Sequence, residues 1–339
     1  MSRSESTLQS VPKWLRLLDY FFILRPTQFF PLWTTMLAGT IAAAPVSFFT
    51  FTFPVASQIL WPMLLAMLWL TLNVGAIYIF NQIADKDNDN YNDKLFFISH
   101  GEMTVEAAWI EGIALTLVSL TGAWFISMDF FVMILASTLV GVCYNFLGFM
   151  NRPLPALLMN FSGGVISFLA GAAATSSLSS SFIPLPLSQR FISLRLTSLI
   201  FSSLAYGFAW AAVYLLVTLP DAEGDRKFGK MTFAVRYGAK ATLIAALTSD
   251  AVSLVIAILS RDVIIGVAAF VSLPLFWQVV RAESSKEVFS PVKFSMLFLA
   301  LMVCLYLPLF LLLLVLTFLA CKIYYRARFG LDYPNFQRR

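Results

Sequence analysis

Residues 69–89, WLTLNVGAIYIFNQIADKDND, join a long apolar run to a dense group of aspartates. The apolar part is typical of a helix that crosses a membrane, and the polar part of its end at the membrane surface. If the helix continues into the polar part, Asn81, Asp85 and Asp89 lie four residues apart on one face, whereas Asp87 points elsewhere. This stretch predicts a membrane helix that ends in a carboxylate face.

The rest of the chain is similarly apolar. Of its 339 residues, 59% are hydrophobic and 12% are charged, whereas soluble domains carry about 25% charged residues. A span needs about 20 mostly apolar residues, and nine stretches qualify. The predicted spans are approximately 28–47, 60–80, 106–126, 129–149, 154–175, 196–218, 240–259, 262–280 and 294–321. We therefore expect an all-α bundle of nine transmembrane helices, not a set of soluble domains.

The regions flanking the spans are polar or amphipathic. Residues 1–12 form a polar tail without the apolar segment of a signal peptide, and 322–339 form a basic tail. Between Lys13 and Arg25, apolar and charged residues mix as in an interfacial helix, and Pro26 then marks the entry to the first span. One transmembrane domain is expected over residues 13–321.

Basic residues predict the orientation in the bilayer. With the N-terminus in the cytoplasm, fifteen of the 23 Lys and Arg residues fall on the inner side and eight on the outer side. This bias predicts a multi-pass protein with a cytoplasmic N-terminus, and together with the lack of a targeting segment it favours a plasma (inner) membrane. The basic C-terminal tail is the exception, so either it is tolerated outside or one predicted span is wrong. We interpret the net charge of +5 as the excess of Lys and Arg in the loops of a membrane protein, and expect no nucleic-acid partner.

A second acidic segment, DAEGDRKFGKMT at 221–232, follows another apolar run. Asp221 and Asp225 again lie four residues apart, on the same predicted side of the membrane as the first segment. Like charges this close repel, so a cation is expected between them. A single pair of this kind is weak evidence, because charged loops between membrane helices are often merely solvated. Two such segments at helix ends on one side indicate a site.

The available ligands favour Mg²⁺. His100 is the single histidine, and Cys143, Cys304 and Cys321 are interpreted as buried apolar residues, so hard carboxylate oxygens remain. Mg²⁺ is usually completed by substrate phosphate oxygens, so two facing carboxylate clusters would clamp a diphosphate. The cations that follow the second segment could neutralise the remaining charge. They are Arg226, Lys227 and Lys230.

These two segments resemble the UbiA superfamily of intramembrane prenyltransferases. The pattern NxxxDxxxD of that family matches Asn81, Asp85 and Asp89, and the pattern DxxxD matches Asp221 and Asp225. The order, spacing and side of both motifs agree with the family over roughly residues 15–320. Smaller matches support the resemblance: Arg25-Pro26, Tyr144-Asn145, Asn151-Arg152-Pro153, and Asn160 followed by Gly163-Gly164.

The resemblance implies a nine-helix bundle around a central cavity, with an isoprenyl diphosphate bound through Mg²⁺ at its cytoplasmic mouth. Two Mg²⁺ ions held by the four aspartates would draw charge onto the leaving diphosphate, and an acceptor would attack the allylic cation. Asn81 would orient an aspartate or a metal-bound water. Further diphosphate contacts are expected from Arg25, Lys94, Arg152, Arg226, Lys227, Lys230, Tyr144 and Asn160.

One segment departs from the family. After the first motif many members carry Lys-Pro or a basic run, whereas residues 92–101 read NDKLFFISHG and keep only Lys94. The acceptor, an aromatic or other lipophilic small molecule, is therefore left open. A UbiA-type terpene cyclase that uses no acceptor is the alternative. A cation transporter is a third hypothesis, but transport carboxylates usually lie near the membrane midplane and not at helix ends.

Overall fold

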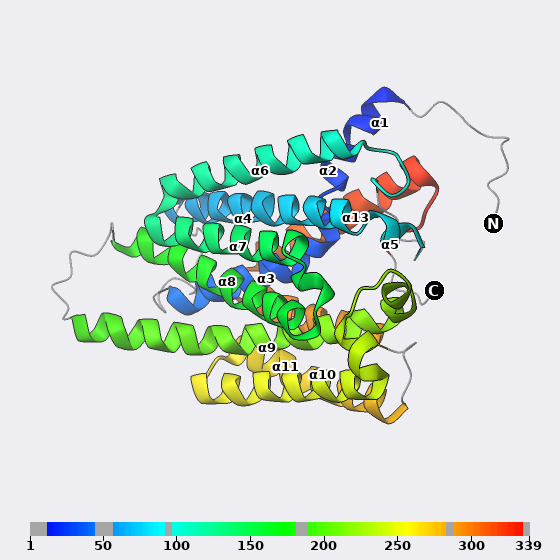
Figure 1. Cartoon of the computed structure of the whole chain (residues 1–339). Helices are drawn as coiled ribbons and strands as arrows, with labels where there is room; N and C mark the ends of the chain where they lie inside the picture. The colour runs from blue at the N-terminus through cyan, green and yellow to red at the C-terminus, as the bar shows by residue number, and fades with distance from the viewer. Residues whose placement is uncertain (1–11, 45–56, 92–96, 181–188, 283–287, 335–339) are drawn as a thin grey trace.

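The computed structural model describes residues 12–44, 57–91, 97–180, 189–282 and 288–334 (Figure 1). These residues form helices and no strand. The helices are α1 (Lys13–Leu17), α2 (Asp19–Phe22), η1 (Pro26–Gln28), α3 (Phe29–Ala43), α4 (Ser57–Ala84), α5 (Lys86–Tyr91), α6 (Val105–Ile126), α7 (Met128–Phe146), η3 (Phe149–Asn151), α8 (Pro153–Ser180), α9 (Gln189–Lys227), α10 (Phe233–Ser260), α11 (Val263–Ala282), α12 (Phe289–Tyr306) and α13 (Pro308–Phe329).

Nine helices of the described chain are long and apolar enough to cross a membrane, namely α4 and α6 to α13. The expected all-α membrane fold is confirmed. The helix of the first predicted span, α3, is not among these nine, because it is described over only 15 residues. The last part of its predicted span, together with the polar tail before residue 12, lies outside the described residues.

The prediction of one final span at 294–321 is wrong. The apolar run is divided between α12 and α13 at Leu307, whose backbone leaves the helical region with φ −131° and ψ 77°. Pro308 occupies the first turn of α13, where its missing N–H costs no hydrogen bond. Pro62, Pro220 and Pro274 lie inside helices, so proline alone does not mark the break.

The helix α13 returns to the end of the bundle at which the acidic segments lie (Figure 1). Its Arg328 pairs with Asp19 of α2 at 3.0 Å and with Glu102 at 2.6 Å. The Tyr324 hydroxyl donates to Asp19 at 2.5 Å, and its ring stacks on Phe22 with centroids 3.6 Å apart. Of the two explanations left open for the basic tail, a wrong predicted span agrees with the structure, because the division into α12 and α13 brings Arg328 to the same end of the bundle as Asp19.

The predicted interfacial helix is also more divided than expected. It consists of α1 and α2, and Trp14 and Phe21 are exposed as expected for a lipid-facing surface. Asp19 is buried, with 4% of its surface exposed, because α13 covers it. It therefore does not lie on a solvated face.

Small residues and polar side chains hold the spans together, as in other membrane bundles. Gly171 of α8 lies so close to α3 that an added Cβ would be 1.8 Å from the Met36 carbonyl oxygen. Asn73 of α4 donates to Thr138 of α7 at 2.7 Å, and Trp210 of α9 donates to Thr35 of α3 at 3.1 Å. These contacts place α3, α4, α7, α8 and α9 around a common interior.

Candidate active site

The first acidic segment keeps its helical register across a break. Although α4 ends at Ala84, the Asp85 amide donates to the Asn81 carbonyl at 2.9 Å, and the Asp89 amide donates to the Asp85 carbonyl at 2.8 Å. Asp85 and Asp89 are buried and Asp87 is exposed. The predicted common face is present, with Asp87 turned away from it.

The second acidic segment lies on the last turns of α9, which extends to Lys227. Asp225 is 3% exposed, and its Oδ1 accepts a 2.8 Å hydrogen bond from the Asn88 amide of α5. This contact joins the two acidic segments directly across 137 positions of sequence. The structure therefore brings together the two motifs that the sequence placed on one side.

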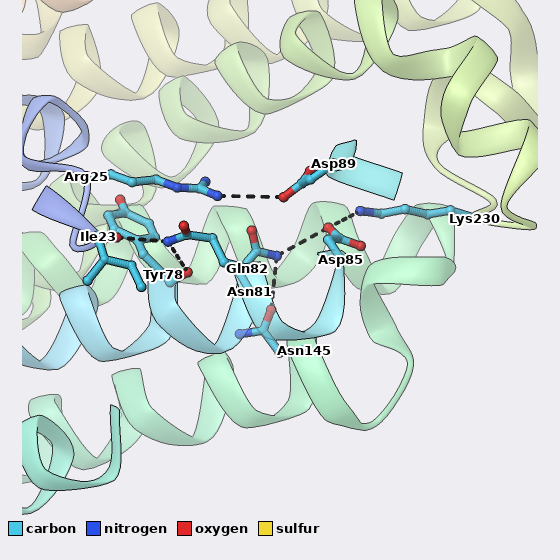
Figure 2. Close-up of polar contacts among 9 residues, drawn as sticks. All are labelled: Ile23, Arg25, Tyr78, Asn81, Gln82, Asp85, Asp89, Asn145 and Lys230. Carbon is cyan, nitrogen blue, oxygen red and sulfur yellow. Dashed lines mark hydrogen bonds and ion pairs between the residues drawn. The ribbon is translucent and has the colours of Figure 1, made fainter. Parts of the chain in front are cut away.

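Lys230 approaches the aspartates from the loop after α9. Its Nζ lies 2.6 Å from Asp85 Oδ2 (Figure 2). Its amide donates to the Asp225 carbonyl at 2.8 Å. Gly229 has φ 71°, a conformation that glycine adopts readily and that turns the chain back towards the site. Burial lowers the pKa of Lys230, but the Asp85 carboxylate and further neighbours outweigh it, so its pKa is raised overall.

Arg25 approaches from the opposite direction in Figure 2, and its Nη2 lies 3.9 Å from Asp89 Oδ2. Its backbone is left-handed, with φ 55°, at the turn between α2 and η1. Burial lowers the pKa of Arg25, and Asp89 offsets part of that shift. The first motif thus has one half-buried cation beside each of its two aspartates.

Two asparagines and a glutamine fix this arrangement. The Asn81 amide donates to Asn145 of α7 at 3.2 Å and lies 3.5 Å from Asp85, and Asn145 donates to the Ile77 carbonyl at 3.3 Å. Gln82 donates to the Ile23 carbonyl at 2.8 Å (Figure 2). This last bond fastens the segment that carries Arg25 to α4.

Most of these groups line one cavity of about 460 Å³, whereas Asp89, Gln82 and Asn88 lie outside its lining. Its polar lining includes Arg25, Asn81, Asp85, Tyr144, Asn145, Asn160, Asp221, Asp225, Lys230 and Thr232. Its apolar lining comes from α3, α4, α7, α8 and α9, and includes Leu32, Val74, Ile77, Val140, Met159, Ile166 and Val217. The cavity therefore joins a charged mouth to an apolar interior, as an amphiphilic anion requires.

The donor set suits a hard divalent cation, because it consists of carboxylates and amides. Among the described residues, however, no three His, Cys, Asp or Glu side chains lie close enough together to hold a metal ion. The carboxylates are instead engaged by protein groups, since Asp85 forms an ion pair with Lys230 and Asp225 accepts a hydrogen bond from Asn88. Mg²⁺, which keeps several ligands from water and phosphate, fits such a divided set better than an ion that needs a complete protein cage.

Residues 32–302 match the sequence profile of the UbiA prenyltransferase family. The chain belongs to this family. The resemblance seen in the two motifs is thereby confirmed, and α13 lies beyond the matched region.

Solved UbiA structures share the fold. A UbiA homolog from Archaeoglobus fulgidus bound to GPP and Mg²⁺ has a TM-score of 0.61 at 18% identity, covering 85% of this chain and 99% of the homolog. The apo UbiA homolog from Aeropyrum pernix K1 has a TM-score of 0.58 at 18% identity, covering 84% and 96%. A digeranylgeranylglyceryl phosphate synthase has a TM-score of 0.58 at 15% identity, covering 86% and 97%. No match was found among curated protein sequences.

Several cations predicted to bind diphosphate lie outside the cavity lining. Arg152, Arg226 and Lys227 are exposed, and the Lys227 ammonium instead lies 3.8 Å from the centre of the Tyr91 ring. Lys94 lies outside the described residues. The structure therefore assembles Arg25 and Lys230 with the UbiA motifs but leaves the other described cations on the surface.

Two residues that were not predicted from the sequence also line the cavity or join the motifs. Asn88 lies seven residues after Asn81, and Tyr214 lies seven residues before Asp221. A spacing of seven returns to the same helix face after two turns, so this signal was present in the sequence. Tyr214 lines the cavity beside Tyr144, and Asn88 bridges the motifs.

Proposed function

We propose that the protein transfers an isoprenyl group from an isoprenyl diphosphate to a lipophilic small-molecule acceptor, with Mg²⁺ as cofactor. The observation that carries this proposal is the meeting of Asp85, Asp225 and Lys230 at the mouth of an otherwise apolar cavity. Solved relatives bound to GPP or DMAPP with Mg²⁺ support both the donor class and the metal.

Each part of the cavity has a task in this reaction. Asp85, Asp89, Asp221 and Asp225 would hold Mg²⁺, which supplies positive charge to the leaving diphosphate. Lys230 and Arg25 are the half-buried cations that would neutralise diphosphate oxygens, and Asn81 would hold Asp85 in place. The apolar interior receives the prenyl chain and excludes water, which would otherwise capture the allylic cation.

The position of α13 supports a proposal for the orientation in the membrane. Because α13 returns, Lys322, Arg326 and Arg328 move to the side that holds the acidic motifs and the described N-terminal helices. This change strengthens the bias that favours the cytoplasm for that side. We infer that the donor diphosphate enters from the cytoplasmic face of a cellular membrane.

The proposal is tested with the full chain in lipid nanodiscs. Geranyl, farnesyl and geranylgeranyl diphosphates are supplied with Mg²⁺, and released diphosphate and lipid products are measured with and without phenolic acceptors. Asp85→Asn should abolish diphosphate release, whereas Asp87→Asn should retain it, because Asp87 is exposed two residues away.

Two outcomes would overturn the proposal. Full diphosphate release by Asp85→Asn would remove the aspartates from the reaction. A cyclic hydrocarbon or alcohol as the main product without any acceptor would identify a terpene cyclase on the same scaffold.

A further inference from the structure

A second cavity, of about 240 Å³, adjoins the first. The two share lining residues from η1, α4, α8 and α9, which are Gln28, Tyr78, Asn160, Trp210, Tyr214 and Val217. The second cavity then extends between α9, α10, α11 and α12. It is mostly apolar and contains one carboxyl group among its described lining residues, that of Asp250.

Asp250 is an unusual residue for this position. It lies in the middle of α10, ten residues before the helix ends, and only 3% of its surface is exposed. A carboxyl group at membrane depth is costly, and such groups generally face a cavity and carry a function. None of the acidic motif residues lines this second cavity.

The protein satisfies Asp250 only in part. Ser272 of α11 lies 3.2 Å from both carboxyl oxygens, but the same hydroxyl also lies 3.1 Å from the Ala269 carbonyl. A serine hydroxyl has one proton to donate, so the carboxyl group receives at most one hydrogen bond from it. The remaining hydrogen-bonding capacity of Asp250 is available to a ligand in the cavity.

The two cavities are suited to different ligands. A prenyl chain has no hydrogen-bonding group, so placing it beside Asp250 would bury that carboxyl group without a further partner. The first cavity already offers the prenyl chain an apolar wall from α4, α7 and α8. A hydroxyl group would instead satisfy Asp250, and the shared wall would direct the molecule that carries it towards the donor.

We propose that the second cavity is the acceptor site and that Asp250, held by Ser272, binds a hydroxyl group of a lipophilic acceptor. This inference rests on the proposed prenyl transfer and specifies its acceptor class. The acceptor hydroxyl donates its hydrogen bond to the Asp250 carboxyl group, while the hydrocarbon part of the acceptor fills the apolar remainder of the cavity. Asp250 is thus a residue that selects the acceptor and is distinct from the residues that bind the donor.

The experiment measures binding without turnover, in nanodiscs that contain the full chain. The probes are 4-heptylphenol and its methyl ether 4-heptylanisole, which have similar shapes but differ in the hydroxyl proton. The wild type should bind the phenol about tenfold or more tightly than the ether, because the ether makes no hydrogen bond to Asp250. Asp250→Leu should bind both probes equally. Stabilisation by geranyl diphosphate and Mg²⁺ should be retained in this variant, which shows that it is folded and binds the donor.

A matched serine pair provides the control. Ser272→Ala should reduce the preference for the phenol, because Asp250 loses its orienting partner. Ser253→Ala should leave the preference unchanged, since Ser253 is equally buried on α10 but donates to the Ala205 carbonyl, away from both cavities. If Asp250→Leu does not fold, Asp250→Asn combined with Ser272→Ala replaces it in the same measurement.

The outcomes separate this inference from the proposed function. Equal binding of the two probes by the wild type, or an unchanged preference in folded Asp250→Leu, would overturn the acceptor site. In either case, stabilisation by geranyl diphosphate and Mg²⁺ would leave the donor site intact. Absence of that stabilisation in the wild type would instead overturn the proposed prenyl transfer.

Discussion

Arg328 and Asp19 form a buried ion pair at 3.0 Å although 309 positions separate them, with side chains 6% and 5% exposed. The pair ties α13 to the N-terminal helices that carry Arg25. Removing one partner of a buried pair leaves an uncompensated charge and costs about 3–5 kcal/mol. We therefore expect Arg328→Leu to lower the unfolding temperature in nanodiscs strongly, and the double variant with Asp19→Leu to recover part of the loss. A double variant no more stable than Arg328→Leu would contradict this coupling.

The hydrogen bond from Asn88 to Asp225 should be necessary for full activity. Residues that orient metal-binding carboxylates typically change activity by about tenfold to a hundredfold when removed. Asn88→Ala should reduce Mg²⁺-dependent diphosphate release by that factor. Asn90→Ala is the control, because Asn90 is an exposed asparagine on the same short helix. Equal rates in the two variants would show that the bridge between the motifs is not needed.

Lys230 should matter more to donor binding than Lys227. The ammonium of Lys230 contacts Asp85 inside the cavity, whereas that of Lys227 lies over the Tyr91 ring on the surface. Lys230→Met should raise the KM for the prenyl diphosphate about tenfold or more, since a charge-assisted contact is lost. Lys227→Met should change it little. A larger increase in KM for Lys227→Met than for Lys230→Met would contradict this order and would favour the diphosphate contact that the sequence predicted for Lys227.

The pairing of Lys230 also predicts a pH effect on stability. Because its folded-state pKa is raised above the usual 10.5, protonated Lys230 stabilises the fold. This contribution is fully present below that value and is lost as pH rises through the higher folded-state pKa. The difference in unfolding temperature between wild type and Lys230→Met should therefore be constant from pH 7 to about pH 9 and shrink above 10.5. A difference that grows above pH 10.5 would have the wrong sign.

Close helix contact at Gly171 makes that position intolerant of a side chain. The Cβ of alanine would lie 1.8 Å from the Met36 carbonyl oxygen, so α3 and α8 would have to separate. Gly171→Ala should destabilise the protein by about 1–3 kcal/mol or more. Gly266→Ala is the matched control, since its Cβ would lie 3.6 Å from Ala257. Thermal unfolding of both variants tests this, and equal stability would contradict the close packing.

The sequence predicted the helical membrane fold and the meeting of the motifs because these depend on local patterns. Apolar runs of span length and an i,i+4 spacing are both set by the geometry of one helix. The two helix ends were expected on the same side, but the specific contact between Asn88 and Asp225 was not predicted. Tyr214 lies seven residues before Asp221, so the geometry of one helix also places these two side chains on the same face.

The remaining features depend on tertiary contacts. Residues 294–321 carry no charge, and Pro308 lies at the start of a helix whereas Pro274 lies inside one, so local sequence did not reveal the turn at Leu307. Which cations reach the cavity depends on the turn at Gly229 and on the left-handed backbone of Arg25. The role of a single acid in an apolar run, such as Asp250, likewise depends on which neighbours surround it.

The bridge between Asn88 and Asp225 also bears on the timing of synthesis. Donor-site residues come from Arg25 to Thr232, so a nascent chain that stops before α9 lacks the second acidic segment and Lys230. Such a fragment has neither the complete set of carboxylates nor the closed apolar wall. Under the proposed function, prenyl transfer therefore requires a chain that has been synthesised through α9 and the loop that carries Lys230.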